Sequence, residues 1–168
     1  MKTTGVIGAG SWGTALATVL AGKGGSVKIW DIDEKHLRSM EENRENVDYL
    51  PGVPLNENIK IAYTVEEALA DADVVLFSAP AQHFRSALTS ALGHIKDDAL
   101  IINVAKGIEQ KTLLRMSQIA ADHIDMDRYV VLSGPSHAEE VGRRLPTTVA
   151  AASYNIEAAE KVQDLFMT

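Results

Sequence analysis

The order of elements within the first 31 residues constrains this chain more than any other feature. A short β-branched run leads into Gly8, Gly10 and Gly13, spaced G-x-G-x-x-G, which open an apolar helical stretch; a second apolar run ends at Asp31, 18 residues after Gly13. Gly8 allows a tight turn, Gly10 lets the backbone approach a diphosphate, and Gly13 lets the helix pack closely on the strand. This order predicts a dinucleotide site, with helix N-terminal amides facing the diphosphate and Asp31 accepting hydrogen bonds from the adenosine ribose. The alternative is an ordinary turn followed by a solvated acid.

Asp31 also bears on the choice between the two nicotinamide cofactors. A carboxylate near the ribose 2′ position tolerates a hydroxyl and repels a phosphate, so the sequence favours NAD over NADP. Ile32 brings no cation for a 2′-phosphate, although Lys35, His36 or Arg38 on the following helix can partly compensate.

Apolar runs alternate with stretches of helical period along the rest of the chain, which predicts an α/β fold. We expect a Rossmann-type, doubly wound and mainly parallel sheet with helices on both faces, because several strands are apolar throughout. The glycine- and proline-containing residues 46–58 are predicted to form a surface loop. The predicted strands are 3–7, 26–30, 59–62, 73–78, 99–104, 129–133 and 147–152, and the predicted helices are 12–23, 33–44, 64–71, 81–93, 111–123 and 155–166.

Composition excludes several classes of protein. The chain has 168 residues, which suits one domain, and 46% of them are hydrophobic, which predicts a packed core. A net charge of -7 argues against binding to nucleic acid or to an anionic membrane. The absence of cysteine excludes thiol chemistry and zinc-thiolate sites. Acidic residues and histidines are not spaced as metal ligands, so we expect no metal site. With no secretory signal or long apolar run in the sequence, we expect a cytoplasmic protein without membrane insertion.

Further candidate residues follow the later strands, where ligands bind in open parallel sheets. Pro80 suits the start of a helix beside the nicotinamide ribose. Lys106 can supply positive charge to a phosphate or polarise a carbonyl, unless it is only a solvated surface lysine. Ser136 can donate to a substrate oxygen or merely cap a short helix. His137 can act as a base, although a lone loop histidine is more often structural.

Five blocks, in this order, resemble the N-terminal domain of NAD(P)-dependent glycerol-3-phosphate dehydrogenase: GAGSWGTALA, ENVDYLPGVPL, VAKGIE, LSGPSHAEEVGRRLPTTVAAAS and VQDLF. The resemblance implies interconversion of dihydroxyacetone phosphate and sn-glycerol 3-phosphate, a precursor of phospholipids. It also implies that Ser11, Trp12 and Ala138 contact the cofactor, that Lys106 touches cofactor and substrate, and that Gly134 and Ser136 border the substrate.

The chain departs from the family pattern in two residues and in its length. His137 stands where the family usually has an aromatic residue, and Ile32 stands where a basic residue or histidine is common. The family carries a second, helical domain that contains a proton-transfer lysine. We expect this domain to be absent from residues 1–168, and a homodimer can form through it. We therefore expect residues 1–168 to bind NAD but to turn over poorly alone. Two alternatives stay open: another NAD-dependent dehydrogenase of the same architecture, or a non-catalytic NAD-sensing module.

Overall fold

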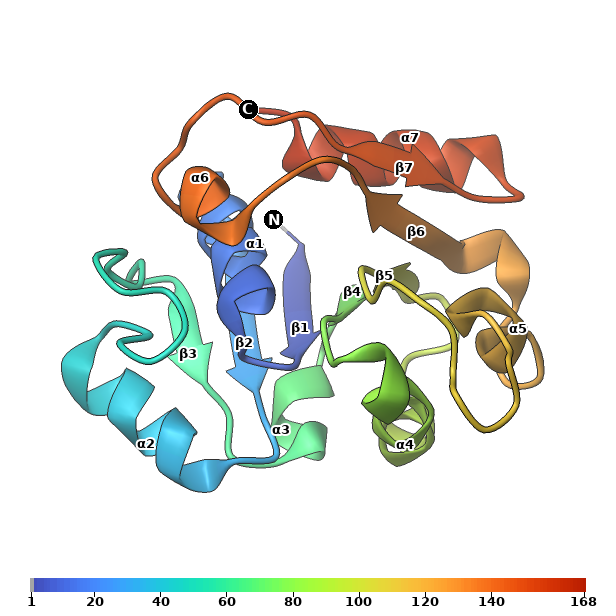
Figure 1. The fold of residues 1–168 in the computed structure, drawn as a ribbon, viewed down its shortest axis with the longest axis horizontal. Helices are drawn as coiled ribbons and strands as arrows, with labels where there is room; N and C mark the ends of the chain where they lie inside the picture. The colour runs from blue at the N-terminus through green and yellow to red at the C-terminus, as the bar shows by residue number, and fades with distance from the viewer. Residues whose placement is uncertain (1) are drawn as a thin grey trace.

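The computed structural model describes residues 2–168, and its framework is one seven-stranded sheet with helices on both faces (Figure 1). The strand order is β3-β2-β1-β4-β5-β6-β7, and all neighbours are parallel except β6 and β7. The chain starts at β1, moves outward to β3 and returns to β4 beside β1, so the winding reverses between β1 and β4. The predicted doubly wound, mainly parallel sheet is confirmed.

All seven predicted strands are present, most of them within a residue or so of the expected bounds. The main difference is β7, which is shorter than predicted and runs antiparallel to β6 at the edge of the sheet. The strands are β1 (Thr3–Ile7), β2 (Ser26–Trp30), β3 (Ile59–Ile61), β4 (Val74–Phe77), β5 (Leu100–Asn103), β6 (Tyr129–Ser133) and β7 (Ala150–Ala152).

Three of the helices begin where a side chain satisfies a free N-terminal amide. Asp33, Thr64 and Asn155 each accept a hydrogen bond from a backbone N–H in the first turn of the helix that follows. The helices are α1 (Ser11–Gly22), α2 (Glu34–Asn43), α3 (Val65–Leu69), α4 (Ala81–Ala91), α5 (Met116–Ala121), α6 (Ala138–Gly142) and α7 (Ile156–Phe166), with short 3₁₀ turns η1 (Leu92–His94) and η2 (Met126–Arg128). Among residues 2–168, no helix is long and apolar enough to span a membrane.

The prediction of one helix over 111–123 is wrong, because only Met116–Ala121 is helical. Leu113 has a φ of 60°, in the left-handed region that an α-helix of L-residues does not contain. The preceding residues instead form a turn that returns on itself, with a bridge between Ile108 and Arg115. Helical period in the sequence therefore extended over a segment that tertiary contacts hold as a loop.

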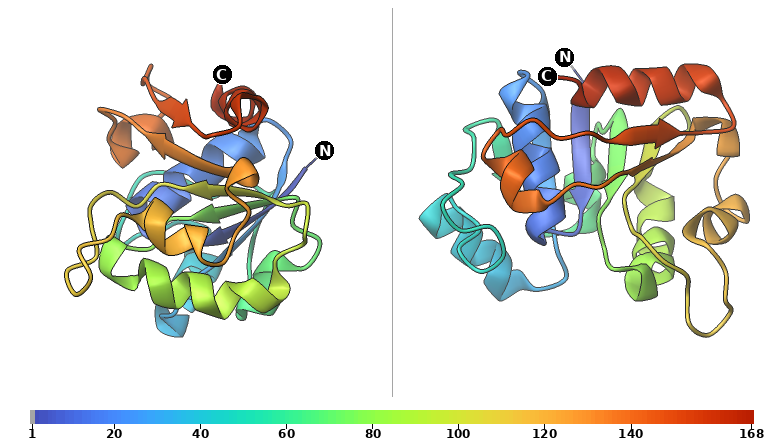
Figure 2. Two further views of the ribbon diagram at one scale, coloured as in Figure 1. Left: turned by 90° about the vertical axis from the view of Figure 1, so that its right-hand side faces the viewer. Right: turned by 45° about the horizontal axis from the view of Figure 1, so that its top comes forward.

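Alternate strand residues enter two separate cores. Val6 and Leu76 face one side of the sheet, where α1, α2 and α7 pack, while Ile7 and Phe77 face the other, where α3, α4 and α5 pack. Figure 2 shows the sheet between α7 on one side and α4 on the other. This two-sided burial explains why the central strands are apolar throughout.

The predicted surface loop at 46–58 is a loop, but three of its apolar side chains, Leu50, Val53 and Leu55, are buried. Leu50 and Val53 pack with Ala15 of α1 and Ala138 of α6 in a third, smaller core. The loop that follows α2 therefore packs against both α1 and α6.

Candidate functional site

The glycine turn between β1 and α1 is close-packed on one side and open on the other. Gly8 has a φ of 109°, and its N–H donates to the carbonyl of Trp30 over 2.8 Å. A Cβ on Gly13 would lie 2.2 Å from the carbonyl oxygen of Gly8, so only glycine allows α1 to approach the turn this closely. A Cβ on Gly10 would meet nothing within 4 Å. The turn therefore presents Gly10 to open space.

The first backbone amides of α1 are available to a ligand. Gly10 occupies the N-cap position and offers no side chain to cap the helix. The N–H groups of residues 10–13 find no acceptor among residues 2–168. These groups lie at the positive end of the helix dipole, where negative charge is favoured.

Asp31 at the end of β2 holds the glycine turn as well as facing solvent. Its Oδ2 accepts the N–H of Ala9 over 2.8 Å, and its Oδ1 accepts the N–H of Asp33 over 3.1 Å. Each carboxylate oxygen retains further acceptor capacity for a ribose hydroxyl. Ile32 follows with 89% of its surface exposed, so no side chain from this position screens Asp31.

Asn46 was not among the residues predicted for the site, yet it contacts the turn directly. It is completely buried, and its amide nitrogen donates to the carbonyl of Ala9 over 2.8 Å. His36 of α2 is also buried, and its Nε2 lies 3.0 Å from the same carbonyl oxygen. Asn46 belongs to the ENVDYLPGVPL block, which marked this segment as part of the family pattern. Its local sequence does not reveal that the side chain contacts Ala9.

The carboxyl end of β4 lies against the glycine turn. A Cβ on Gly13 would lie 3.0 Å from the hydroxyl of Ser78, the residue that follows β4. Pro80 then occupies the N-cap position of α4, one residue earlier than the first-turn position predicted for it. Ser78 and Ala79 therefore lie beside the turn, as expected from the reversal of winding between β1 and β4, and Pro80 follows them in the chain.

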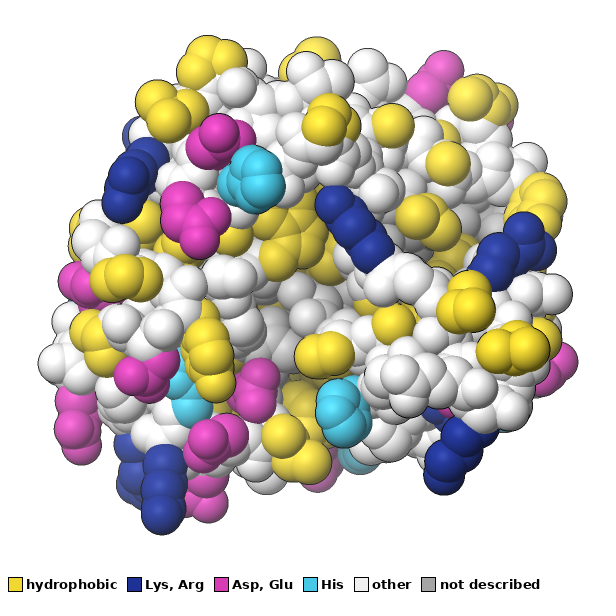
Figure 3. Space-filling model, viewed as in Figure 1, with side chains coloured by type: hydrophobic (Ala, Val, Ile, Leu, Met, Phe, Trp, Pro, Cys, Tyr) yellow, Lys and Arg dark blue, Asp and Glu magenta, His cyan; other side chains and the backbone are white. Residues whose placement is uncertain are grey.

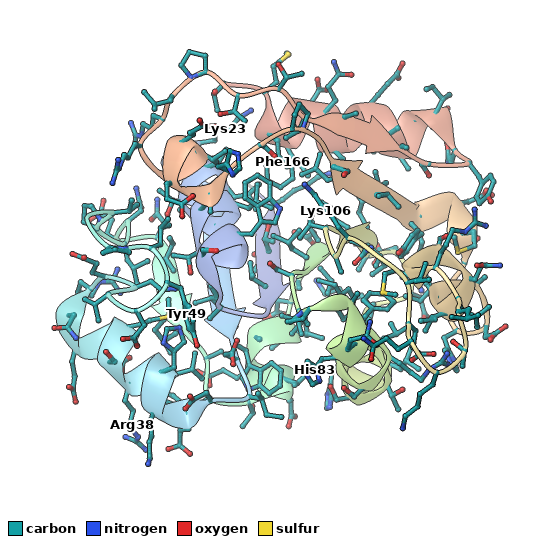
Figure 4. The ribbon with its side chains drawn as sticks, viewed as in Figure 1. Lys23, Arg38, Tyr49, His83, Lys106 and Phe166 are labelled. Atoms are coloured by element: carbon teal, nitrogen blue, oxygen red, sulfur yellow. The ribbon has the colours of Figure 1, made fainter. Side chains whose placement is uncertain are left out.

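Lys106 lies in the loop after β5 and reaches the loop after β6. Its ammonium donates to the carbonyl of Gly134 over 3.0 Å, and the side chain is otherwise exposed. Figure 3 shows a hollow in this face with apolar side chains on its floor and a Lys or Arg side chain at its rim, where Figure 4 labels Lys106. The structure thus brings Lys106 and Gly134 together.

The loop that carries Lys106 is anchored to α4. The side chain of Gln82 donates to the carbonyl of Ile108 and accepts the N–H of Gln110. Arg85 makes two hydrogen bonds of 2.8 Å with Glu109, which is 8% exposed. The Arg85 guanidinium, together with the Thr112 hydroxyl, lowers the pKa of Glu109 to about 2.

Three side-chain polar atoms are buried without a hydrogen-bond partner within residues 2–168: the hydroxyl of Ser136 in the loop after β6, the indole N–H of Trp12 in α1 and the hydroxyl of Tyr129 in β6. The alternative that Ser136 caps a helix is wrong, because His137 is the N-cap of α6 and makes no capping bond with its side chain. Ala138 is buried at the start of that helix. Unpaired buried donors of this kind are costly unless a ligand or water satisfies them.

A groove of about 1050 Å³ with a mixed apolar and polar lining includes Trp12. Its walls come from α1, from residues 144–151 and from α7, including Leu16, Val149 and Phe166. Across the described residues 2–168, no three His, Asp or Glu side chains gather as metal ligands.

Residues 3–159 match the family described as NAD-dependent glycerol-3-phosphate dehydrogenase N-terminus. Glycerol-3-phosphate dehydrogenase [NAD(P)+] of Pelotomaculum thermopropionicum is 49% identical over 165 residues, covering 96% of this chain and 47% of that protein. The Bacillus subtilis enzyme is 46% identical over 170 residues, covering 99% and 49%. The chain spans about half the length of the curated relatives it matches.

Solved structures agree with this relationship. Glycerol-3-phosphate dehydrogenase from Coxiella burnetii superposes with a TM-score of 0.92 at 30% identity, covering 99% of this chain and 51% of that one. A UDP-D-ManNAc dehydrogenase from Pyrococcus horikoshii shares the fold at a TM-score of 0.80, with only 15% identity and coverage of 99% and 44%. The family match, which includes the glycine turn and Lys106, shows that the chain belongs to the NAD-dependent glycerol-3-phosphate dehydrogenase N-terminal family.

Proposed function

We propose that this chain is the nucleotide-binding half of an enzyme that interconverts dihydroxyacetone phosphate and sn-glycerol 3-phosphate by hydride transfer. The observation that carries the proposal is the row of unpaired N–H groups at residues 10–13, which opens onto the space beside Gly10. An overall charge of -7 offers no general attraction to an anion, so local dipoles must hold the diphosphate.

The residues present fit a nicotinamide dinucleotide. The space beside Gly10 is open and a larger side chain would fill it. The buried indole N–H of Trp12 has no acceptor among residues 2–168 and can donate to the ligand. In this proposal Gly8, Gly10 and Gly13 shape the turn and its amides hold the diphosphate, while Asp31 accepts from the adenosine ribose. Ser11, Trp12, Pro80, Lys106 and Ala138 form the remaining contacts. When bound, the nicotinamide supplies or accepts the hydride.

Lys106, Gly134 and Ser136 border the proposed substrate side. The Lys106 ammonium already donates to the Gly134 carbonyl, and it retains two N–H donors for a phosphate or carbonyl oxygen of the substrate. The unpaired hydroxyl of Ser136 supplies a further donor. These groups bind and polarise the substrate oxygen, and a group in the second half of the enzyme exchanges the proton with it.

We infer a preference for NAD(H) over NADP(H). A phosphate on the ribose 2′ position would lie beside the Asp31 carboxylate, which its two backbone partners hold in place. The nearby Arg38 is engaged by Glu34 four residues earlier on α2. Ile32, which follows Asp31, is uncharged and does not offset repulsion between Asp31 and a 2′-phosphate.

NADH binding to the chain, followed by tryptophan fluorescence, tests the nucleotide site. Gly10→Ala fills this open space and is expected to weaken binding about tenfold or more, whereas Gly93→Ala is a matched control because its Cβ also meets nothing within 4 Å, in η1 beyond α4. Failure of the unsubstituted chain to bind NADH at millimolar concentration would overturn the proposal. Equal binding by both variants would also contradict it.

Oxidation of NADH with dihydroxyacetone phosphate tests the claim about the second half. Because the chain spans about half of its relatives, we expect little or no turnover from it alone. Full turnover by residues 1–168 would show that the chain needs no second half.

A further inference from the structure

Ala9 lies inside the glycine turn, and side chains hold both sides of its backbone. Its N–H donates to Asp31, and its carbonyl oxygen accepts from Asn46 over 2.8 Å and from His36 Nε2 over 3.0 Å. Thr14 of α1 adds a longer contact of 3.4 Å to the same oxygen. Ala9 itself is completely buried, so solvent does not compete for this carbonyl.

Asn46 is the most fully committed of these partners. Its amide nitrogen donates to the Ala9 carbonyl and to the Thr14 hydroxyl, each over 2.8 Å. Its amide oxygen accepts the N–H of Tyr49 over 3.0 Å, which fixes the orientation of the side chain. Both amide hydrogens are therefore used inside the core, one of them on the glycine turn.

The direction of the Ala9 carbonyl determines the direction of the next N–H. The carbonyl of Ala9 and the N–H of Gly10 belong to one peptide unit, and residues 2–168 contain no cis peptide bond. In a planar trans peptide these two groups point in opposite directions. Donors that draw the carbonyl into the core therefore turn the Gly10 N–H away from it, and this N–H finds no acceptor among residues 2–168.

We propose that Asn46 is a positioning residue for the nucleotide: by holding the Ala9 carbonyl, it aims the Gly10 N–H at the bound diphosphate. The inference rests on the proposed function, because it needs a diphosphate at the turn. It also assigns a role to residues 46–58, the loop after α2: through Asn46, this loop contacts Thr14 in the first turn of α1. Asn46 acts through the peptide unit and does not touch the ligand.

The test compares Asn46→Ala with Leu88→Ala, using NADH and adenosine as probes. Leu88 is completely buried in α4 on the other face of the sheet, so its truncation destabilises the fold without altering the turn. Asn46→Ala leaves His36 as a donor to the Ala9 carbonyl, and the fold is therefore expected to persist. We expect Asn46→Ala to weaken NADH binding about tenfold, the effect of losing one well-aimed hydrogen bond to a charged group.

Adenosine lacks the diphosphate and separates positioning from general damage. Its affinity is expected to stay within twofold in Asn46→Ala, and Leu88→Ala is expected to bind both probes like the unsubstituted chain. Equal losses for NADH and adenosine, or a matching loss in Leu88→Ala, would mean that Asn46 has only a structural role. Unchanged NADH binding in Asn46→Ala would refute the inference directly.

Two further measurements keep these outcomes distinct. If the unsubstituted chain does not bind NADH, the proposed function fails rather than the role of Asn46. If Asn46→Ala does not fold, Asn46→Ser removes the amide group that donates to the Ala9 carbonyl, keeps a small polar side chain in the core, and gives the same comparison. In that variant NADH binding must again fall more than adenosine binding.

Discussion

The guanidinium of Arg85 on α4 holds the carboxylate of Glu109, three residues beyond Lys106, through two hydrogen bonds of 2.8 Å. This pair joins the loop after β5 to the helix after β4. Because α4 begins at the carboxyl end of β4, the contact places the Lys106 loop relative to the glycine turn.

The Arg85–Glu109 pair predicts a specific acid sensitivity. The pKa of Glu109 is lowered to about 2 from an ordinary 4.5, so its contribution to stability is complete above about 4.5 and is lost as the pH falls toward 2. We expect the difference in unfolding free energy between the unsubstituted chain and Glu109→Gln to shrink over that window. Urea unfolding at a series of pH values measures it, and a constant difference would contradict the assignment.

Cofactor preference is predicted to respond to charge beside Asp31. Ile32→Arg places a cation next to Asp31, where the proposed site holds the adenosine ribose, and we expect it to raise NADPH affinity about tenfold relative to NADH. Ile156→Arg is the control, since Ile156 is also largely exposed, at 69%, but lies at the start of α7. Titration of both variants with NADH and NADPH measures this preference. An equal gain in relative NADPH affinity in Ile32→Arg and Ile156→Arg would show that the effect comes from net charge alone.

Packing at the turn predicts opposite outcomes for two glycines of the same motif. Gly13→Ala forces a Cβ against the Gly8 carbonyl, and we expect a loss of about 1–3 kcal/mol in the free energy of unfolding. Gly10→Ala meets no atom within 4 Å and is expected to leave stability nearly unchanged. Denaturant unfolding measures both, and a Gly13→Ala chain as stable as Gly10→Ala would contradict the close approach of α1 to the turn.

The unpaired hydroxyl of Ser136 predicts a substitution without a stability cost. Ser136→Ala removes no hydrogen bond of the described chain and relieves a buried donor, so its melting temperature is expected to stay constant or rise slightly. Ser153→Ala is the matched control, because that hydroxyl donates to the Tyr129 carbonyl over 2.7 Å and its removal should cost about 1 kcal/mol. A clear loss of stability in Ser136→Ala would show that the hydroxyl has a structural partner.

Local sequence was sufficient for the architecture and for the glycine turn. Apolar runs and glycine spacing reflect requirements within a few residues, such as the positive φ of Gly8, and they predicted the strands and their parallel arrangement. The prediction of a helix over 111–123 was wrong because its start depends on contacts distant in the sequence. Glu109, just before this segment, pairs with Arg85 of α4, and the loop that follows Glu109 contains Leu113 in the left-handed region. Helical periodicity does not reveal such a contact.

What the sequence by itself determined was the glycine turn between β1 and α1 and the alternation of strands and helices, because these depend on local backbone and burial patterns. Only the tertiary structure decided that Asn46 enters the core to hold Ala9 and that Ser136 is left without a partner. Both are matters of long-range hydrogen bonding. Whether a polar side chain is buried, and what it meets there, depends on segments that approach only when the sheet is assembled.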